Sequence, residues 1–100
     1  EARQRLDELA DRWLALRAAL ARATHLRPLP FNAAYFALLQ LPEGVDAEAA
    51  RLHLLERHGT GVIAIPEVNA LRVAYCSLAL EDIAPLVDTL DQGVSELLTA

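Results

Sequence analysis

The sequence predicts an α+β fold in which three helices pack against a three-stranded antiparallel sheet. Three observations lead to this prediction. Apolar residues recur at helical spacing near both ends of the chain, a central segment has helix-capping residues at both of its ends, and the other apolar runs are short and bounded by glycine or proline. The predicted order of elements is α-β-α-β-β-α. With 100 residues the chain has the length of one domain, and we divide residues 1–100 into a long connecting helix over 1–24 and an α/β sandwich over 31–100.

The composition excludes several classes of function. The chain is 54% hydrophobic with a formal net charge of −5, whereas a protein that grips nucleic-acid backbones needs clustered positive charge. All nine positive residues are arginines, which excludes a lysine Schiff base and a P-loop lysine. No apolar run approaches the roughly 18 residues of a membrane span, the N-terminus lacks an apolar signal-peptide core, and Cys76 is the single cysteine. We therefore expect a cytoplasmic protein that binds neither nucleic acid nor membrane.

The first helix is predicted over residues 2–24. Apolar residues recur there at intervals of 3, 4, 3 and 4 and form one stripe: Leu6, Leu9, Trp13, Leu16 and Leu20. A coiled coil would need about three or four heptads, and this stripe covers only about two, so we expect a helix that faces the core. Pro28 and Pro30 prevent the helix from continuing.

The first strand and the second helix follow. Residues 33–41 are predicted to be a strand, and the segment 41–46 contains the proline and glycine of a turn. Asp46 is a good N-cap for a helix over 47–58. Gly59 stands where a left-handed C-cap residue belongs.

The second half of the chain predicts a hairpin and a last helix. Strands at 61–65 and 71–76 are joined by the short connection 66–69, and the helix covers about 80–98. The crossover from the first strand to the second makes these two strands parallel. If the third strand lies between them, every neighbouring pair is antiparallel, which gives a split β-α-β sheet in the order 1-3-2.

Arg72 is a charged residue inside an otherwise apolar or small strand, and a buried guanidinium is costly unless something pairs with it. It could be structural, capping a carboxylate or reaching solvent from the strand end, or it could bind an anionic ligand through two parallel hydrogen bonds. The strands are apolar on both faces, so either the first helix or another domain should cover the second face. Alternation divides the third strand into two sets: Leu71, Val73 and Tyr75 on one face, and Arg72 with the small Ala74 and Cys76 on the other.

Other candidate sites have plainer explanations. His53 and His58 are five residues apart, the wrong spacing for one helical face, and His25 stands alone, so we expect no metal site. The Gly-x-Gly that begins at Gly59 follows a helix instead of opening one, so it is not a dinucleotide fingerprint. Cys76 has no base that the sequence places beside it, and we expect a buried structural cysteine.

Read together, three segments resemble the C-terminal small domain of the class I/II aminotransferases, which are fold-type I enzymes that depend on pyridoxal phosphate. These segments are the "FN-x-x-YF" strand entry, the unit "GVDAEAARLHLLERHGTGVIAI", and "LRVAYCSLALEDI". The resemblance covers essentially the whole chain, and it depends on the order and spacing of the three segments together.

The resemblance implies a function for Arg72, which occupies the position of the arginine that binds the substrate α-carboxylate. The lysine, the aspartate at the pyridine nitrogen and the phosphate-binding groups of such enzymes lie on the large domain. The resemblance thus implies a C-terminal fragment of a longer, homodimeric enzyme that moves an amino group from an amino acid to a 2-oxo acid. This fragment by itself would form a lid over substrate, hold no cofactor and have no activity.

Two alternatives stay open at this stage. The parent could run another reaction of the same cofactor, such as decarboxylation or β-elimination. The chain could also be an autonomous small-ligand or protein-interaction module with no catalytic activity, since a fold does not fix a function. Ala33 and Ala34 depart from the family pattern, which often has glycine there, and this bears on which substrate fits.

Overall fold

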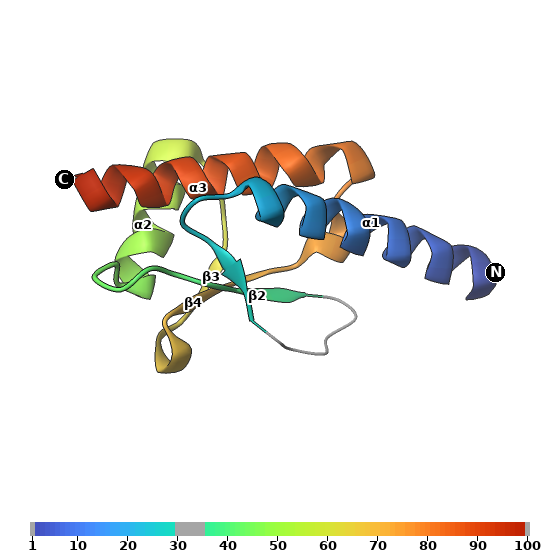
Figure 1. The fold of residues 1–100 in the computed structure, drawn as a ribbon, viewed down its shortest axis with the longest axis horizontal. Coiled ribbons are helices and arrows are strands. Elements are labelled where there is room, and N and C mark those ends of the chain that lie inside the picture. Colours follow the sequence, from blue (N-terminus) through green and yellow to red (C-terminus); the bar gives the residue numbers. More distant parts are fainter. Residues whose placement is uncertain (1, 30–35, 100) are drawn as a thin grey trace.

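The structure is a computed structural model, and it describes residues 2–29 and 36–99, with the backbone alone for residues 2–9. Figure 1 shows three helices above a small sheet, with α1 and α3 side by side. Short 3-10 turns lie on either side of β4 and before α3. The regular elements follow in this order: α1 (Ala2–Arg22), β1 (Arg27–Pro28), β2 (Ala37–Gln40), α2 (Ala47–His58), β3 (Ile63–Ile65), β4 (Ala70–Val73) and α3 (Ile83–Thr99).

The sheet confirms the α+β class but has four strands instead of the three predicted. Its order is β1-β2-β4-β3, and all neighbours are antiparallel. The three predicted strands keep β4 in the middle. The additional strand β1 pairs Arg27 with Gln40 and Pro28 with Leu39. Its Pro28 suggested only a helix stop, yet an edge strand tolerates proline because one of its sides has no partner strand.

The bounds of several elements differ from the predictions. The helix α2 matches, because the Asp46 side chain accepts a hydrogen bond of 3.0 Å from the Ala49 backbone N–H and Gly59 has the left-handed φ of 61°. The helix α1 ends at Arg22, and α3 begins three residues late because Leu80–Asp82 form a 3-10 turn. Of the strand predicted over 33–41, residues 33–35 lie outside the described residues.

One face of the sheet forms the core with all three helices. Leu39 of β2 and Leu71 of β4 are opposite each other and have no exposed surface. The ring of Trp13 on α1 lies 5.9 Å from the ring of Tyr75, which follows β4. The largest fully buried side chains come from every layer: Leu16, Leu39, Leu54, Leu71, Ile83, Val87, Leu90 and Val94.

No described helix covers the other face of the sheet (Figure 1). The prediction left open that the first helix covers it, but α1 packs beside α3 on the core side. Across the uncovered face, Arg72 lies between Leu38 of β2 and Ile63 of β3, and Ile63 is 47% exposed. The sheet is therefore one wall of a two-layer structure.

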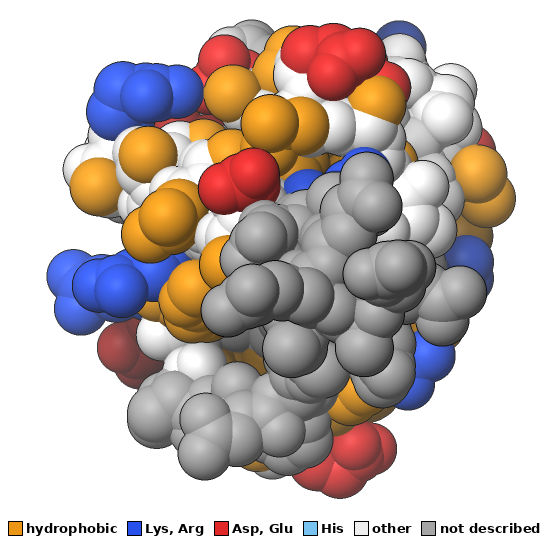
Figure 2. Space-filling view, turned by 90° about the vertical axis from the view of Figure 1, so that its right-hand side faces the viewer, with side chains coloured by type: hydrophobic (Ala, Val, Ile, Leu, Met, Phe, Trp, Pro, Cys, Tyr) orange, Lys and Arg blue, Asp and Glu red, His pale blue; other side chains and the backbone are white. Residues whose placement is uncertain are grey.

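The described surface keeps several large hydrophobic side chains exposed. From the N-terminal end of α1, Figure 2 shows hydrophobic side chains at the surface between acidic and basic ones. None of the described helices is long and apolar enough to span a membrane. The exposed residues come from α1, α2, the hairpin, the 3-10 turn before α3, and α3 itself: Leu14, Leu52, Leu55, Ile63, Val68, Leu80 and Leu98.

Candidate functional site

Arg72 lies in the central strand β4 on the uncovered face of the sheet. Its side chain is half-buried, and its guanidinium carbon lies 4.9 Å from the centre of the Phe36 ring. Such a cation–π contact contributes about 0.5–1 kcal/mol at exposed sites. The ring thus provides a flat apolar support for the guanidinium.

The strand alternation predicted for Arg72 is confirmed, but the neighbours predicted for it are wrong. Leu71, Val73 and Tyr75 are buried on the core side, as expected. The strand, however, ends at Val73, and residues 75–77 form a 3-10 turn. The residues beside Arg72 are therefore Leu38 and Ile63 of the adjacent strands, which are larger than the small side chains expected. Cys76 is half-buried in that turn and does not lie in a strand.

The charge of Arg72 is not matched by a carboxylate of the described chain. Ion pairs among the described residues join Arg51 to Glu48 and the two histidines of α2 to Glu96, and Arg72 takes part in none of them. A guanidinium whose carbon lies over a ring still has N–H donors to offer a ligand. The arrangement can therefore hold a planar anion such as a carboxylate by two parallel hydrogen bonds.

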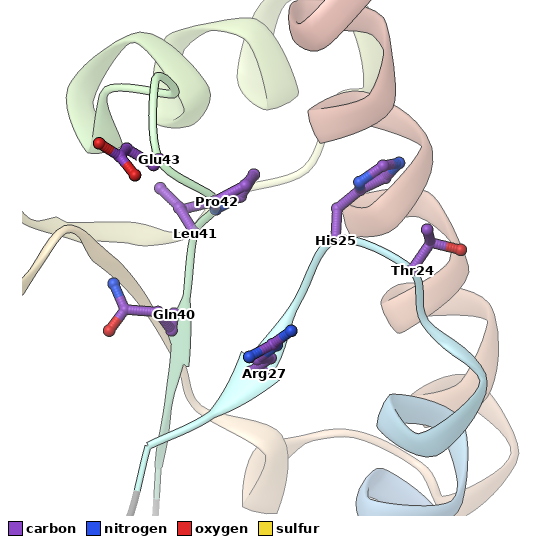
Figure 3. A pocket seen from close by; sticks show the side chains of 7 residues that line it. All are labelled: Thr24, His25, Arg27, Gln40, Leu41, Pro42 and Glu43. Atoms are coloured by element: carbon purple, nitrogen blue, oxygen red, sulfur yellow. The ribbon is translucent and has the colours of Figure 1, made fainter.

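A separate pocket of about 440 Å³ lies between the turn after α1 and the end of β2. The Asp91 carboxylate supports that turn by accepting hydrogen bonds of 3.1 Å and 2.8 Å from the backbone N–H groups of Thr24 and His25. In Figure 3 the side chains of Gln40 and Glu43 point away from those of Thr24 and His25. Because the polar groups do not converge, this pocket has no arrangement that would orient a ligand.

A second group of polar side chains joins α2 to α3. The Nε2 atoms of His53 and His58 lie 2.7 Å and 2.8 Å from the same oxygen, Oε1 of Glu96. The ring centres of the two histidines are 5.8 Å apart, in an edge-on arrangement. The spacing of five residues predicts that the two histidines do not share one helical face, but they still converge, because both side chains turn toward a third residue on another helix.

The histidines change the electrostatics of Glu96. Hydrogen bonds from His53 and then His58 lower the pKa of the Glu96 carboxyl to about 2, and Gln92 also contributes through a bond of 3.3 Å to Oε2. The two helices can approach because residue 93 is glycine. A Cβ atom there would lie 2.5 Å from Cδ2 of Leu54. Glu96, one helical turn after Gly93, is thereby brought to α2.

Comparisons with known proteins place the fold. No protein-family model and no curated protein matches the sequence. A solved structure of LysN, the α-aminoadipate aminotransferase of Thermus thermophilus, complexed with N-(5'-phosphopyridoxyl)-L-leucine, matches with a TM-score of 0.72 and 26% identity, over 88% of this chain and 25% of that chain.

Two further aminotransferases have the same fold over this region. An archaeal alanine:glyoxylate aminotransferase matches with a TM-score of 0.64 and 22% identity, over 89% of this chain and 23% of that one. The aromatic aminotransferase Aro9 from C. Albicans matches with a TM-score of 0.68 and 17% identity, over 88% of this chain and 23% of that one. These neighbours show that the chain is similar to one part, about a quarter by length, of pyridoxal-phosphate-dependent aminotransferases, as the sequence resemblance predicts.

Proposed function

We propose that this chain is the C-terminal small domain of a pyridoxal-phosphate-dependent aminotransferase and that Arg72 binds the carboxylate of its amino-acid or 2-oxo-acid substrate. The observation that carries the proposal is the place of Arg72 in the sheet. It is a half-buried cation on the uncovered face, its guanidinium carbon lies over the Phe36 ring, and no carboxylate of the described chain pairs with it.

The surroundings of Arg72 suit a binding role more than a structural one. Leu38 and Ile63 on either side offer no hydrogen-bond acceptor in their side chains, so they leave the guanidinium donors for a ligand. An apolar rim lowers the local dielectric and strengthens a charge-assisted pair with an incoming carboxylate. Arg72 would then fix the orientation of the substrate, which is positioning and not chemistry.

The chain does not fit a complete cofactor site. Pyridoxal phosphate acts as an electron sink and is carried on a lysine in such enzymes, and this sequence contains no lysine. We therefore assign the cofactor to the rest of a longer, homodimeric enzyme. The role of this chain would be to hold the substrate carboxylate and, by closing over it, to exclude water from the reaction.

The test uses the intact enzyme that contains this sequence. Arg72→Gln should raise the KM for the amino acid and lower kcat/KM by about 100-fold, which corresponds to the loss of roughly 2–3 kcal/mol from a charge-assisted bidentate pair. The absorption spectrum of the bound cofactor should not change. Arg17→Gln, at an exposed position on α1, is the matched control and should leave KM unchanged.

Two results would contradict the proposal. If Arg72→Gln unfolds the protein while Arg17→Gln does not, Arg72 is structural. If KM for an amine that lacks the carboxylate rises as much as KM for the amino acid, Arg72 does not act on the carboxylate. Arg72→Lys provides a further check, because lysine keeps the charge but loses the bidentate geometry and should restore only part of the affinity.

A further inference from the structure

We propose that His53, His58 and Glu96 form a binding site for a divalent transition-metal ion, with zinc as the ion that suits the ligands best. Two imidazoles and one carboxylate are a ligand set that zinc accepts at open sites, where water takes the fourth position. The proposal is independent of the function proposed above. It also revises the expectation, drawn from the spacing of the two histidines, that the chain has no metal site.

The three side chains converge as metal ligands do. One ligand atom from each residue lies within 4.8 Å of the other two. Ligands at about 2.0–2.2 Å from a tetrahedral zinc ion lie roughly 3.3 Å from one another. The Nε2 atoms of His53 and His58 are 2.7 Å and 2.8 Å from Oε1 of Glu96, so these two distances need to widen by only roughly 0.6 Å. The histidine nitrogens themselves lie within 4.8 Å of each other, so all three distances are close to those of a metal site.

In the present hydrogen bonds, both histidine nitrogens share one oxygen of the Glu96 carboxylate. Each histidine can donate through Nε2 only if that nitrogen carries the proton, and both bonds then end on one carboxylate oxygen. To bind a metal ion through Nε2, each neutral histidine would carry its proton on Nδ1 instead, and a single cation would then contact three donor atoms. The same side chains would then share one cation, and the Glu96 carboxylate would neutralise one of its two positive charges.

The site is accessible to solvent, and neighbouring residues of α2 and α3 support its ligands. A pocket of about 540 Å³ opens beside it and is lined by the three ligands together with Arg57 and Leu97. The side chains of His53, His58 and Glu96 are 20%, 21% and 38% exposed, so an ion and its water can reach them. The contact of Gly93 with Leu54 sets the distance between the helices, and Gln92 holds the second oxygen of Glu96. Such supporting contacts orient ligands and raise metal affinity.

Arg57 is the one described group at this pocket that opposes a cation. Its side chain is exposed at the end of α2, where water and salt screen its charge. We therefore expect Arg57→Ala to tighten metal binding about twofold to fivefold, in proportion to a screened surface repulsion of less than 1 kcal/mol. This variant should strengthen metal binding, whereas removing a ligand residue should weaken it.

The experiment titrates zinc alone, and then cobalt alone, into the intact polypeptide that contains this sequence. Calorimetry should detect one zinc ion per chain that disappears in His53→Gln, and the cobalt-loaded protein should have the visible absorption bands of a tetrahedral site. Glu96→Gln and His58→Gln should each weaken binding by at least about tenfold. The matched control is His25→Gln, which removes the third histidine of the chain, outside the cluster, and should change nothing.

A second measurement covers the case in which a variant folds poorly. Zinc should raise the melting temperature of the unmodified protein, and a chelator should reverse this rise, because an ion that binds the folded state stabilises it. Two quantities are compared between the unmodified protein and well-folded Glu96→Gln: the heat of zinc binding and the rise in melting temperature that zinc causes. The proposal is overturned if both quantities are the same in the two proteins. It is also overturned if His25→Gln is the variant that loses the ion, or if one ion binds two chains.

Discussion

The two faces of the sheet differ in what they contact, although the strands are apolar on both. The core face carries Leu39, Leu71 and Val73 against three helices, and these residues are buried. The opposite face carries Leu38, Arg72 and Ile63, which are at most half-buried. The difference shows that alternation in a strand decides which residues share a face, whereas the helices decide which face becomes the core. The uncovered face can then take a charge that the core could not.

The largest expected effect is a loss of stability on the core face. Leu71→Ala should lower the free energy of unfolding by about 2–5 kcal/mol, because it opens a cavity at a fully buried position. Leu38→Ala and Arg72→Met, on the uncovered face, should each cost less than about 1 kcal/mol. Urea denaturation of the three variants measures the comparison directly. Equal losses on both faces would mean that the uncovered face is part of the folded core.

A smaller effect should come from the contact between α2 and α3. Gly93→Ala places a methyl group against the fully buried Leu54. Overpacking of this kind costs about 1–3 kcal/mol, and the better helix propensity of alanine offsets up to about 1 kcal/mol of it. We expect a net loss of about 1 kcal/mol, measured by thermal denaturation. Gly61→Ala is the control, because open space surrounds that position, and it should change stability little. If Gly93→Ala has the same stability as the unmodified protein, the two helices can separate freely.

The smallest effect concerns Tyr75, on the core side, at high pH. Burial raises the pKa of the Tyr75 hydroxyl above its usual 10.0, and the neighbouring Cys76 adds to the shift. The folded state therefore keeps its proton more firmly than the unfolded state. The resulting stability is fully present below pH 10 and is lost as the pH rises through the higher folded pKa. Urea midpoints between pH 8 and 11 should fall more for the unmodified protein than for Tyr75→Phe. If the urea midpoints of the two proteins change with pH in the same way, the raised pKa of Tyr75 is contradicted.

Under the proposed function, the same contrast should separate binding from stability at Arg72. In the intact enzyme, we expect Arg72→Gln to weaken substrate binding strongly, although the residue contributes little to folding. Leu71→Ala should do the reverse, with a large loss of stability and, in the molecules that remain folded, a nearly unchanged KM. Measuring both quantities for both variants distinguishes a residue that recognises a ligand from one that builds the core.

Local chemistry determined much of this protein from the sequence. The cap residues Asp46 and Gly59 define the ends of α2 because they satisfy backbone groups within a few residues of themselves. Alternation around Arg72 separated it from Leu71 and Val73 because the period of a strand is fixed by its backbone. The resemblance of the whole chain to aminotransferases likewise depended on short motifs in a fixed order, and the neighbours with the same fold confirm it.

Long-range packing decided the rest. The edge strand β1 exists because β2 offers a partner on its open side, which no local pattern around Pro28 reveals. The helix α1 could have covered either face of the sheet, and its contacts with α3 settled which one. The convergence of His53 and His58 depends on Glu96, 38 positions beyond the second histidine. A spacing rule describes one helix, whereas this cluster requires two helices that approach closely at Gly93, and only the tertiary structure sets that distance.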